Sequence, residues 1–178
     1  MARLFAAPAF AELPALPGLE LREVDWGPVT EIAPFRGAEG DVSAALQAAH
    51  GIAFPAAGEA PRAGAARALW VGPGRALLIG VAPPDGLRAA LTDQTGAQAV
   101  LLAEGAAVEA VLARLVPVDL SPEALTEGRT VRTFIGHMTA SVTRVGAEAM
   151  ELAVMRSMAG SLLHDLGRAT KMLAARAG

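Results

Sequence analysis

The sequence of 178 residues contains no cysteine and no tyrosine, and lysine occurs once, as Lys171. The absence of cysteine excludes disulfides, thiolate metal sites, iron–sulfur clusters and a cysteine nucleophile. No apolar run reaches the ~18 residues that a membrane-spanning helix needs, and the first residues lack the apolar stretch of a secretory signal. We therefore expect a cytoplasmic protein without a membrane partner.

Basic residues are not in excess either. The 15 lysines and arginines stand against 18 acidic residues, which gives a net charge of −3. A protein that binds nucleic acid normally carries a basic face, so we expect no nucleic-acid partner. The length suits one domain, or two small halves fused into one, and suffices for a core without disulfide or metal staples.

Residues 1–18 combine prolines with alanines and follow neither a helical nor a strand period. This pattern predicts an extended N-terminal arm that docks on a partner. Phe5 and Phe10 are its candidate docking residues, and the Met-bearing C-terminal helix is another candidate surface. Residues 19–178 are expected to form a single domain.

Apolar spacing in residues 19–178 predicts both helices and strands. Helices are expected over 41–50, 108–115 and 157–174, with Asp41 and Ser157 as N-caps and Gly51 after the first helix. A further short helix is expected to carry Leu87 and Leu91. Strands are expected near 19–23 and over 29–35, 68–71, 76–79, 98–102, 130–135, 140–145 and 149–155.

The two halves, roughly 19–95 and 96–178, share an order of elements without convincing residue identity. Each is expected to give a strand, a helix, paired antiparallel strands and a closing helix. The pattern predicts an α+β fold in which duplicated β-α-β-β-α units form antiparallel sheets with helices packed on one face.

Motifs for catalysis or cofactor binding are missing from the sequence. It has no G-x-S-x-G, no G-x-G-x-x-G and no paired histidines at metal-ligand spacing. The segment Gly72-Pro73-Gly74 joins two predicted strands and suits a type II turn, whereas a phosphate loop would lead into a helix. We therefore expect no catalytic, cofactor-binding or metal-binding residue in this chain, and structural or surface roles for His50, His137 and His164.

Arginines of the second half form a more suggestive group. Arg132, Arg144 and Arg156 share one face of a sheet if the strand registers align. One interpretation is a solvated face with neighbouring acids. The other is a patch that docks an anion or a partner protein, because the rigid fork of arginine suits carboxylates and interfaces.

Several short motifs, taken in order, resemble the gamma subunit of heterotetrameric sarcosine oxidase. The most specific are an L-W-x-G-P hairpin, a P-x-D-L turn and an R-S-x-A junction between a strand and a helix. Where the family usually has an acidic residue and a tryptophan after its G-P turn, this chain has Gly74-Arg75-Ala76. The matching segments are Phe35-Arg36-Gly37, a helix ending at Gly51, Phe54-Pro55, Arg67 to Pro73, Val116 to Leu120 and Val154 to Ala159.

The resemblance implies a fold similar to the tetrahydrofolate-binding domain of glycine-cleavage aminomethyltransferases. It also implies an accessory, non-catalytic subunit that assembles with alpha and beta subunits, in a complex that oxidatively demethylates sarcosine to glycine. FAD, FMN, NAD and tetrahydrofolate are then expected on the other subunits.

Three alternatives stay open at this point. The chain is also compatible with a gamma-like subunit of a related N-methyl amino acid dehydrogenase complex. A second alternative is a free-standing tetrahydrofolate-binding module, which would use Trp70 with the three arginines. The third is a stand-alone enzyme, which would need a cleft where titratable groups meet.

Overall fold

The computed structural model describes residues 7–177, over which the chain forms ten strands in two antiparallel sheets and three α-helices. Sheet 1 has the order β3-β4-β5-β2-β6, from β2 (Val29–Pro34), β3 (Arg62–Ala63), β4 (Ala66–Gly72), β5 (Arg75–Ile79) and β6 (Ala89–Asp93). Sheet 2 has the order β1-β7-β10-β9-β8, from β1 (Glu20–Glu23), β7 (Gln98–Glu104), β8 (Thr130–Ile135), β9 (Met138–Gly146) and β10 (Ala149–Met155). The helices are α1 (Glu39–His50), α2 (Val108–Leu112) and α3 (Ala159–Ala177), and a single 3-10 turn, Arg156–Met158, precedes α3. The predicted α+β class is confirmed.

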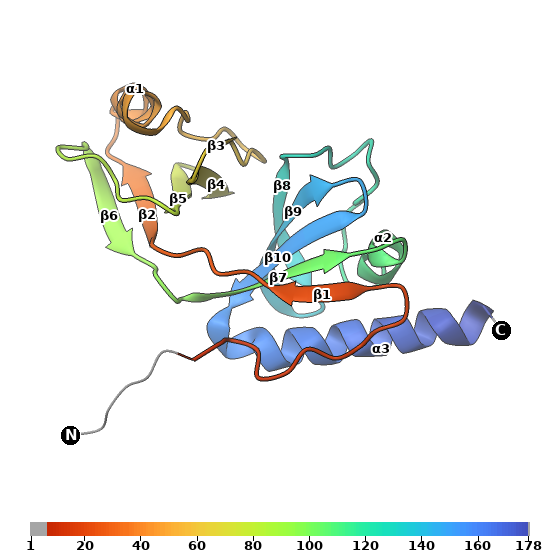
Figure 1. Cartoon of the computed structure of the whole chain (residues 1–178). Helices are drawn as coiled ribbons and strands as arrows, with labels where there is room; N and C mark the ends of the chain where they lie inside the picture. Colours follow the sequence, from red (N-terminus) through yellow and green to blue (C-terminus); the bar gives the residue numbers. More distant parts are fainter. Residues whose placement is uncertain (1–6, 178) are drawn as a thin grey trace, which may run out of the picture.

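The elements stack in four layers, with α1 outside sheet 1 and with α2 and α3 outside sheet 2 (Figure 1). Val42 and Leu46 of α1 pack on Ile32 of sheet 1. On the opposite face of sheet 1, Leu69 and the other inward-facing residues form a cluster with side chains of sheet 2. Each sheet therefore carries helices on one face, as predicted, and turns its other face to the second sheet.

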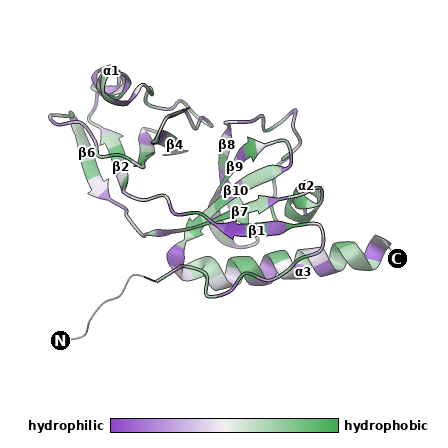
Figure 2. Ribbon diagram, viewed as in Figure 1, coloured by the Kyte–Doolittle hydropathy of each residue, from purple (hydrophilic) through white to green (hydrophobic). Residues whose placement is uncertain are grey.

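The largest hydrophobic cluster lies between sheet 2 and its helices. On β10 the alternation of side chains sends Leu152 toward the helices and Glu151 toward sheet 1. The strands of sheet 2 are largely hydrophobic, whereas the edge strand β1 is mostly hydrophilic (Figure 2). Within residues 7–177, none of the helices has the length and apolar character to cross a membrane.

The described part of the N-terminal arm, residues 7–18, packs against its own domain and runs beside α3 (Figure 1). Phe10 is 5% exposed and belongs to the core of sheet 2 and its helices. The Ala9 N–H donates to Glu23 Oε1 at 2.6 Å, which ties the arm to β1. The expectation that Phe10 contacts a partner is therefore wrong, because this chain already buries it. Phe5 lies outside the described residues.

Local turn and cap signals are confirmed where they depend on glycine. Strands β4 and β5 pair across the expected hairpin, with Leu69 opposite Leu77, and Gly74 has φ +64° in the turn. Gly51 has φ +72° and its N–H donates to the Gln47 carbonyl at 3.0 Å, which ends α1. Both glycines occupy left-handed backbone that other residues rarely adopt.

The short helix expected around Leu87 and Leu91 is wrong, because this segment leads into strand β6. Leu91 lies opposite Ile32 in an antiparallel pairing with β2. A spacing of four residues fits one face of a helix, but it fits one face of a strand equally well. Pro83 and Pro84 upstream, followed by Gly86 at φ +73°, then favour extended chain.

Both predicted side-chain N-caps are also wrong. The helix α1 begins at Glu39, so Asp41 lies inside its first turn, where a negative charge favours the helix dipole. Ser157 lies in the 3-10 turn, and α3 begins two residues later. Asp41 is therefore two residues too late to cap α1, and Ser157 is two residues before the start of α3.

Strand β1 crosses the proposed boundary between the halves. It comes first in the chain, yet it pairs with β7 in sheet 2, with Leu21 opposite Ala103. All strands of sheet 1 come from residues 29–93, and the rest of sheet 2 comes from residues 98–155. The description of 19–95 and 96–178 as pseudo-repeats stays a prediction.

Candidate functional site

A buried ion pair joins the two sheets. Arg67 Nη1 of β4 donates to Glu151 Oε1 of β10 at 2.5 Å. The two residues are 9% and 7% exposed, respectively. Removing both charges from water is costly, and their attraction, which is strong in a medium of low dielectric constant, opposes that cost.

Trp26 covers the other side of this arginine. The guanidinium carbon of Arg67 lies 5.7 Å from the centre of the indole ring, within the range of a cation–π contact. Arg67 Nη2 and Trp26 Nε1 are both buried, and neither has a hydrogen-bond partner among the described residues. The arginine is thus held between a carboxylate and an aromatic ring.

Strand alternation explains why these residues meet. On β4, Ala66 and Ala68 face α1, so Arg67 and Leu69 face sheet 2. On β10, Glu151 faces sheet 1. The two polar side chains therefore enter the same layer from opposite sheets.

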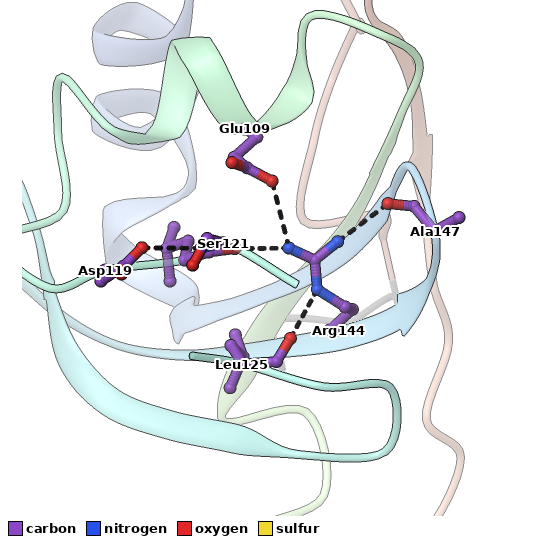
Figure 3. A network of polar contacts seen from close by, with 7 residues as sticks. Glu109, Asp119, Ser121, Leu125, Arg144 and Ala147 are labelled. Atoms are coloured by element: carbon purple, nitrogen blue, oxygen red, sulfur yellow. Dashed lines mark hydrogen bonds and ion pairs between the residues drawn. The ribbon is translucent and has the colours of Figure 1, made fainter. Parts of the chain in front are cut away.

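Arg144 of β9 forms a second buried network, on the helix side of sheet 2 (Figure 3). Its side chain is 3% exposed. Nε donates to the Leu125 carbonyl at 2.6 Å and Nη1 to the Ala147 carbonyl at 2.8 Å. Nη2 donates to the Leu120 carbonyl and to Glu109 Oε2 of α2, the latter at 3.3 Å. One guanidinium thus fastens the loop over 117–125 to α2 and β9.

An aspartate turn shapes the same loop (Figure 3). Asp119 Oδ1 accepts a hydrogen bond from the Ser121 N–H at 2.8 Å. This backbone bond, and then the bond to the Ser121 side chain, lower the pKa of Asp119 below its usual value. The P-x-D-L segment therefore has a structural role, because it presents the Leu120 carbonyl to Arg144.

Arg132 lies on the opposite face of sheet 2 from Arg144. It pairs with Ser141 across β8 and β9, and its Nη1 donates to Ser141 Oγ at 3.1 Å. Because Arg144 is three residues further along β9 than Ser141, its side chain points the other way. Burial, and then the charge of Arg75, lower the pKa of Arg132.

Arg156 lies in the 3-10 turn rather than on a strand. Its Nη2 donates to the Ala7 carbonyl of the N-terminal arm. Together with Trp26, Asp25, Ala7 and several neighbours, it lines an open cavity of about 560 Å³.

The structure does not bring Arg132, Arg144 and Arg156 onto one face. Trp70 follows the inward-facing Leu69 on β4, so it lies on the α1 side of sheet 1, away from sheet 2. The pieces expected for a folate site therefore do not converge. A docking role for Arg132 and Arg156 stays a prediction, whereas Arg144 is occupied within its own chain.

The three histidines lie on different elements of the fold. His50 Nε2 is 2.9 Å from the Ala82 carbonyl at the end of α1, whereas His137 is in the turn before β9 and His164 is on α3. Among residues 7–177, no group of three or more histidines and carboxylates is arranged to hold a metal ion.

Sequence reasoning missed the residues between the sheets. Arg67 and Glu151 are 84 positions apart, so no local motif connects them. A usable signal did exist, because Glu151 lies within a predicted strand and Arg67 directly precedes another, and the sequence neighbours of both are apolar. Burial of such a charge requires a partner of opposite sign.

Comparison with known proteins gives a consistent result. No protein-family model matches the chain. The chain is 30% identical over 177 residues to the sarcosine oxidase subunit gamma of Corynebacterium sp. (strain U-96), which covers 93% of this chain and 85% of that protein. It is also similar to a chain of the solved heterotetrameric sarcosine oxidase from Corynebacterium sp. U-96 in complex with pyrrole 2-carboxylate. That match has a TM-score of 0.76 and 26% identity, and it covers 91% of this chain and 88% of the other. With sequence and fold in agreement over nearly its whole length, this chain belongs to the sarcosine oxidase gamma-subunit family.

Proposed function

We propose that this chain is the accessory gamma subunit of a heterotetrameric, sarcosine oxidase-type flavoenzyme. The observation that carries the proposal is the match to the Corynebacterium gamma subunit over 93% of this chain. The buried charged side chains support it, since Arg67, Glu151 and Arg144 all make contacts that hold the fold together.

In this proposal the chemistry belongs to the larger subunits. They would carry FAD, FMN, NAD and tetrahydrofolate and convert sarcosine to glycine by oxidative demethylation. This chain would contribute a folded surface to the assembly, in the cytoplasm.

Co-expression tests the proposal directly. A tag on this chain should retrieve the alpha and beta subunits of the same organism, with the yellow colour of bound flavin, in a fixed stoichiometry. The chain purified alone should be colourless and should not oxidise sarcosine. Assembly of the other subunits into an active enzyme that excludes the tagged chain would contradict the proposal.

The substrate of the complex is tested on the same preparation. We expect hydrogen peroxide to form with sarcosine and not with N-methylglutamate. Activity confined to N-methylglutamate would instead support the related dehydrogenase complex.

A further inference from the structure

An open cavity of about 650 Å³ lies between the two sheets, beside the Arg67–Glu151 ion pair. Its volume falls in the range that accommodates small organic ligands, which is roughly 300–1,000 Å³. One row of sheet 2 forms its floor, because the strand registers place four lining residues side by side. Across β1, β7, β10 and β9 these are Arg22, Leu102, Glu151 and Thr143.

Sheet 1 and the loop before β8 supply the walls. Arg62 of the edge strand β3 and Arg67 of β4 line the cavity from sheet 1. Glu127 and Gly128 line it from the loop. Residues from both sheets and a loop thus converge on the cavity, although they are distant in sequence.

The lining carries an excess of positive charge. Its charged residues are Arg22, Arg62, Arg67, Arg144, Glu127 and Glu151. Glu151 neutralises Arg67, and Arg144 is paired with Glu109 behind sheet 2. Arg22 and Arg62 form no salt bridge with any described residue, and the remaining acid in the lining is Glu127.

The guanidinium of Arg67 is held in a fixed position at the inner wall of the cavity. Its contacts with Glu151 and Trp26 leave it little freedom to turn away. Walls of low dielectric constant concentrate the field of unneutralised charges, here those of Arg22 and Arg62, and raise the local concentration of anions. Guanidinium groups recognise planar or tetrahedral oxyanions by paired N–H donors.

We propose that this cavity binds a small oxyanion, a carboxylate or phosphate group, between Arg22 of sheet 2 and Arg62 of sheet 1, with Arg67 at the inner wall. The site is formed by this chain alone. It is separate from the arginine group predicted from the sequence, of which Arg144 alone reaches the cavity lining.

Calorimetric titration of the full chain tests the proposal, with sodium phosphate and sodium succinate as probes and sodium chloride at equal ionic strength as the blank. We expect saturable, one-to-one binding of at least one probe. The variants Arg22→Gln and Arg62→Gln should each weaken it by about tenfold or more, because each loses a charged hydrogen-bond donor. Both positions are exposed, so both variants should unfold at the wild-type temperature.

Arg36→Gln is the matched control, because Arg36 is an exposed arginine before α1 and is not among the cavity-lining residues. It should bind the probes as the wild type does. Binding of phosphate alone or of succinate alone supports the proposal and assigns the ligand class. Heats no larger than those of chloride, or equal affinity in Arg62→Gln and Arg36→Gln, would overturn it.

Discussion

Arg67 Nη1 of β4 and Glu151 Oε1 of β10 lie 2.5 Å apart and connect the two sheets, which also share an apolar cluster. Both side chains are buried between sheet 1 and sheet 2, where each neutralises the charge of the other. The interaction therefore has a larger effect on stability than an ion pair at the surface would have.

Replacing Glu151 with glutamine should destabilise the fold by about 3–5 kcal/mol, because it leaves the Arg67 charge buried without a counter-charge. Urea denaturation monitored by tryptophan fluorescence measures the change. Glu59→Gln is the control, since Glu59 and Arg129 form a pair at 3.2 Å whose side chains are 43% and 44% exposed. That change should cost less than about 1 kcal/mol. Equal costs for the two variants would contradict the role assigned to the buried pair.

Arg144→Lys should also destabilise the chain, by about 2–4 kcal/mol, although it conserves charge. A lysine ammonium cannot reach the carbonyls of Leu120, Leu125 and Ala147 together with Glu109, as the guanidinium does. Hydrogen exchange should quicken in the loop over 117–125. Arg88→Lys, at an exposed pair with Asp41, should change stability by less than about 0.5 kcal/mol. A loop that keeps its exchange rates in Arg144→Lys would refute the fastening role.

Gly80 and Gly86 form a matched test of backbone crowding. Both have positive φ, of +84° and +73°. A Cβ at Gly80 would lie 2.3 Å from the Ala65 carbonyl oxygen, whereas at Gly86 it would meet nothing within 4 Å. Gly86→Ala should cost about 1 kcal/mol from backbone strain alone. Gly80→Ala should cost clearly more, as a lower melting temperature, and equal melting temperatures would contradict the prediction.

The pKa of Asp93 is lowered by the side chain and then by the backbone N–H of Thr95. The folded state thus favours the ionised carboxylate. Its stabilising effect on the turn is present above the unfolded pKa and is lost as the pH falls through the lower, folded pKa. In a carbonyl carbon-13 titration, Asp93 should titrate below an unfolded peptide control. Thr95→Ala should raise the Asp93 midpoint and leave Asp119, which has its own Ser121 partner, unchanged.

The sequence predicts the fold best where the signal is local. The hairpin around Pro73-Gly74 and the end of α1 at Gly51 depend on residues that are neighbours in the chain. The helix predicted around Leu87 and Leu91 is wrong because a spacing of four is common to helix and strand. Pairing with β2 stabilises the strand instead. The local sequence pattern does not show which distant strand a segment will pair with.

The contacts of single polar residues were harder to predict than the elements that carry them. The strands of Arg67, Arg132, Arg144 and Glu151 were all expected, but the faces of these side chains depend on register. A shift of one residue moves a side chain to the opposite face. The three arginines do not share one face for this reason, since Arg132 and Arg144 belong to different faces of sheet 2.

The pairing of β1 with β7 has a consequence for synthesis on the ribosome. Glu20 of β1 lies opposite Glu104 of β7. The first strand to leave the exit tunnel therefore has no hydrogen-bonding neighbour until more than half of the polypeptide has been translated. Sheet 1, by contrast, draws every strand from residues 29–93 and is free to close earlier. The leading segment, with Phe10 uncovered, is therefore what a nascent-chain chaperone meets during that interval.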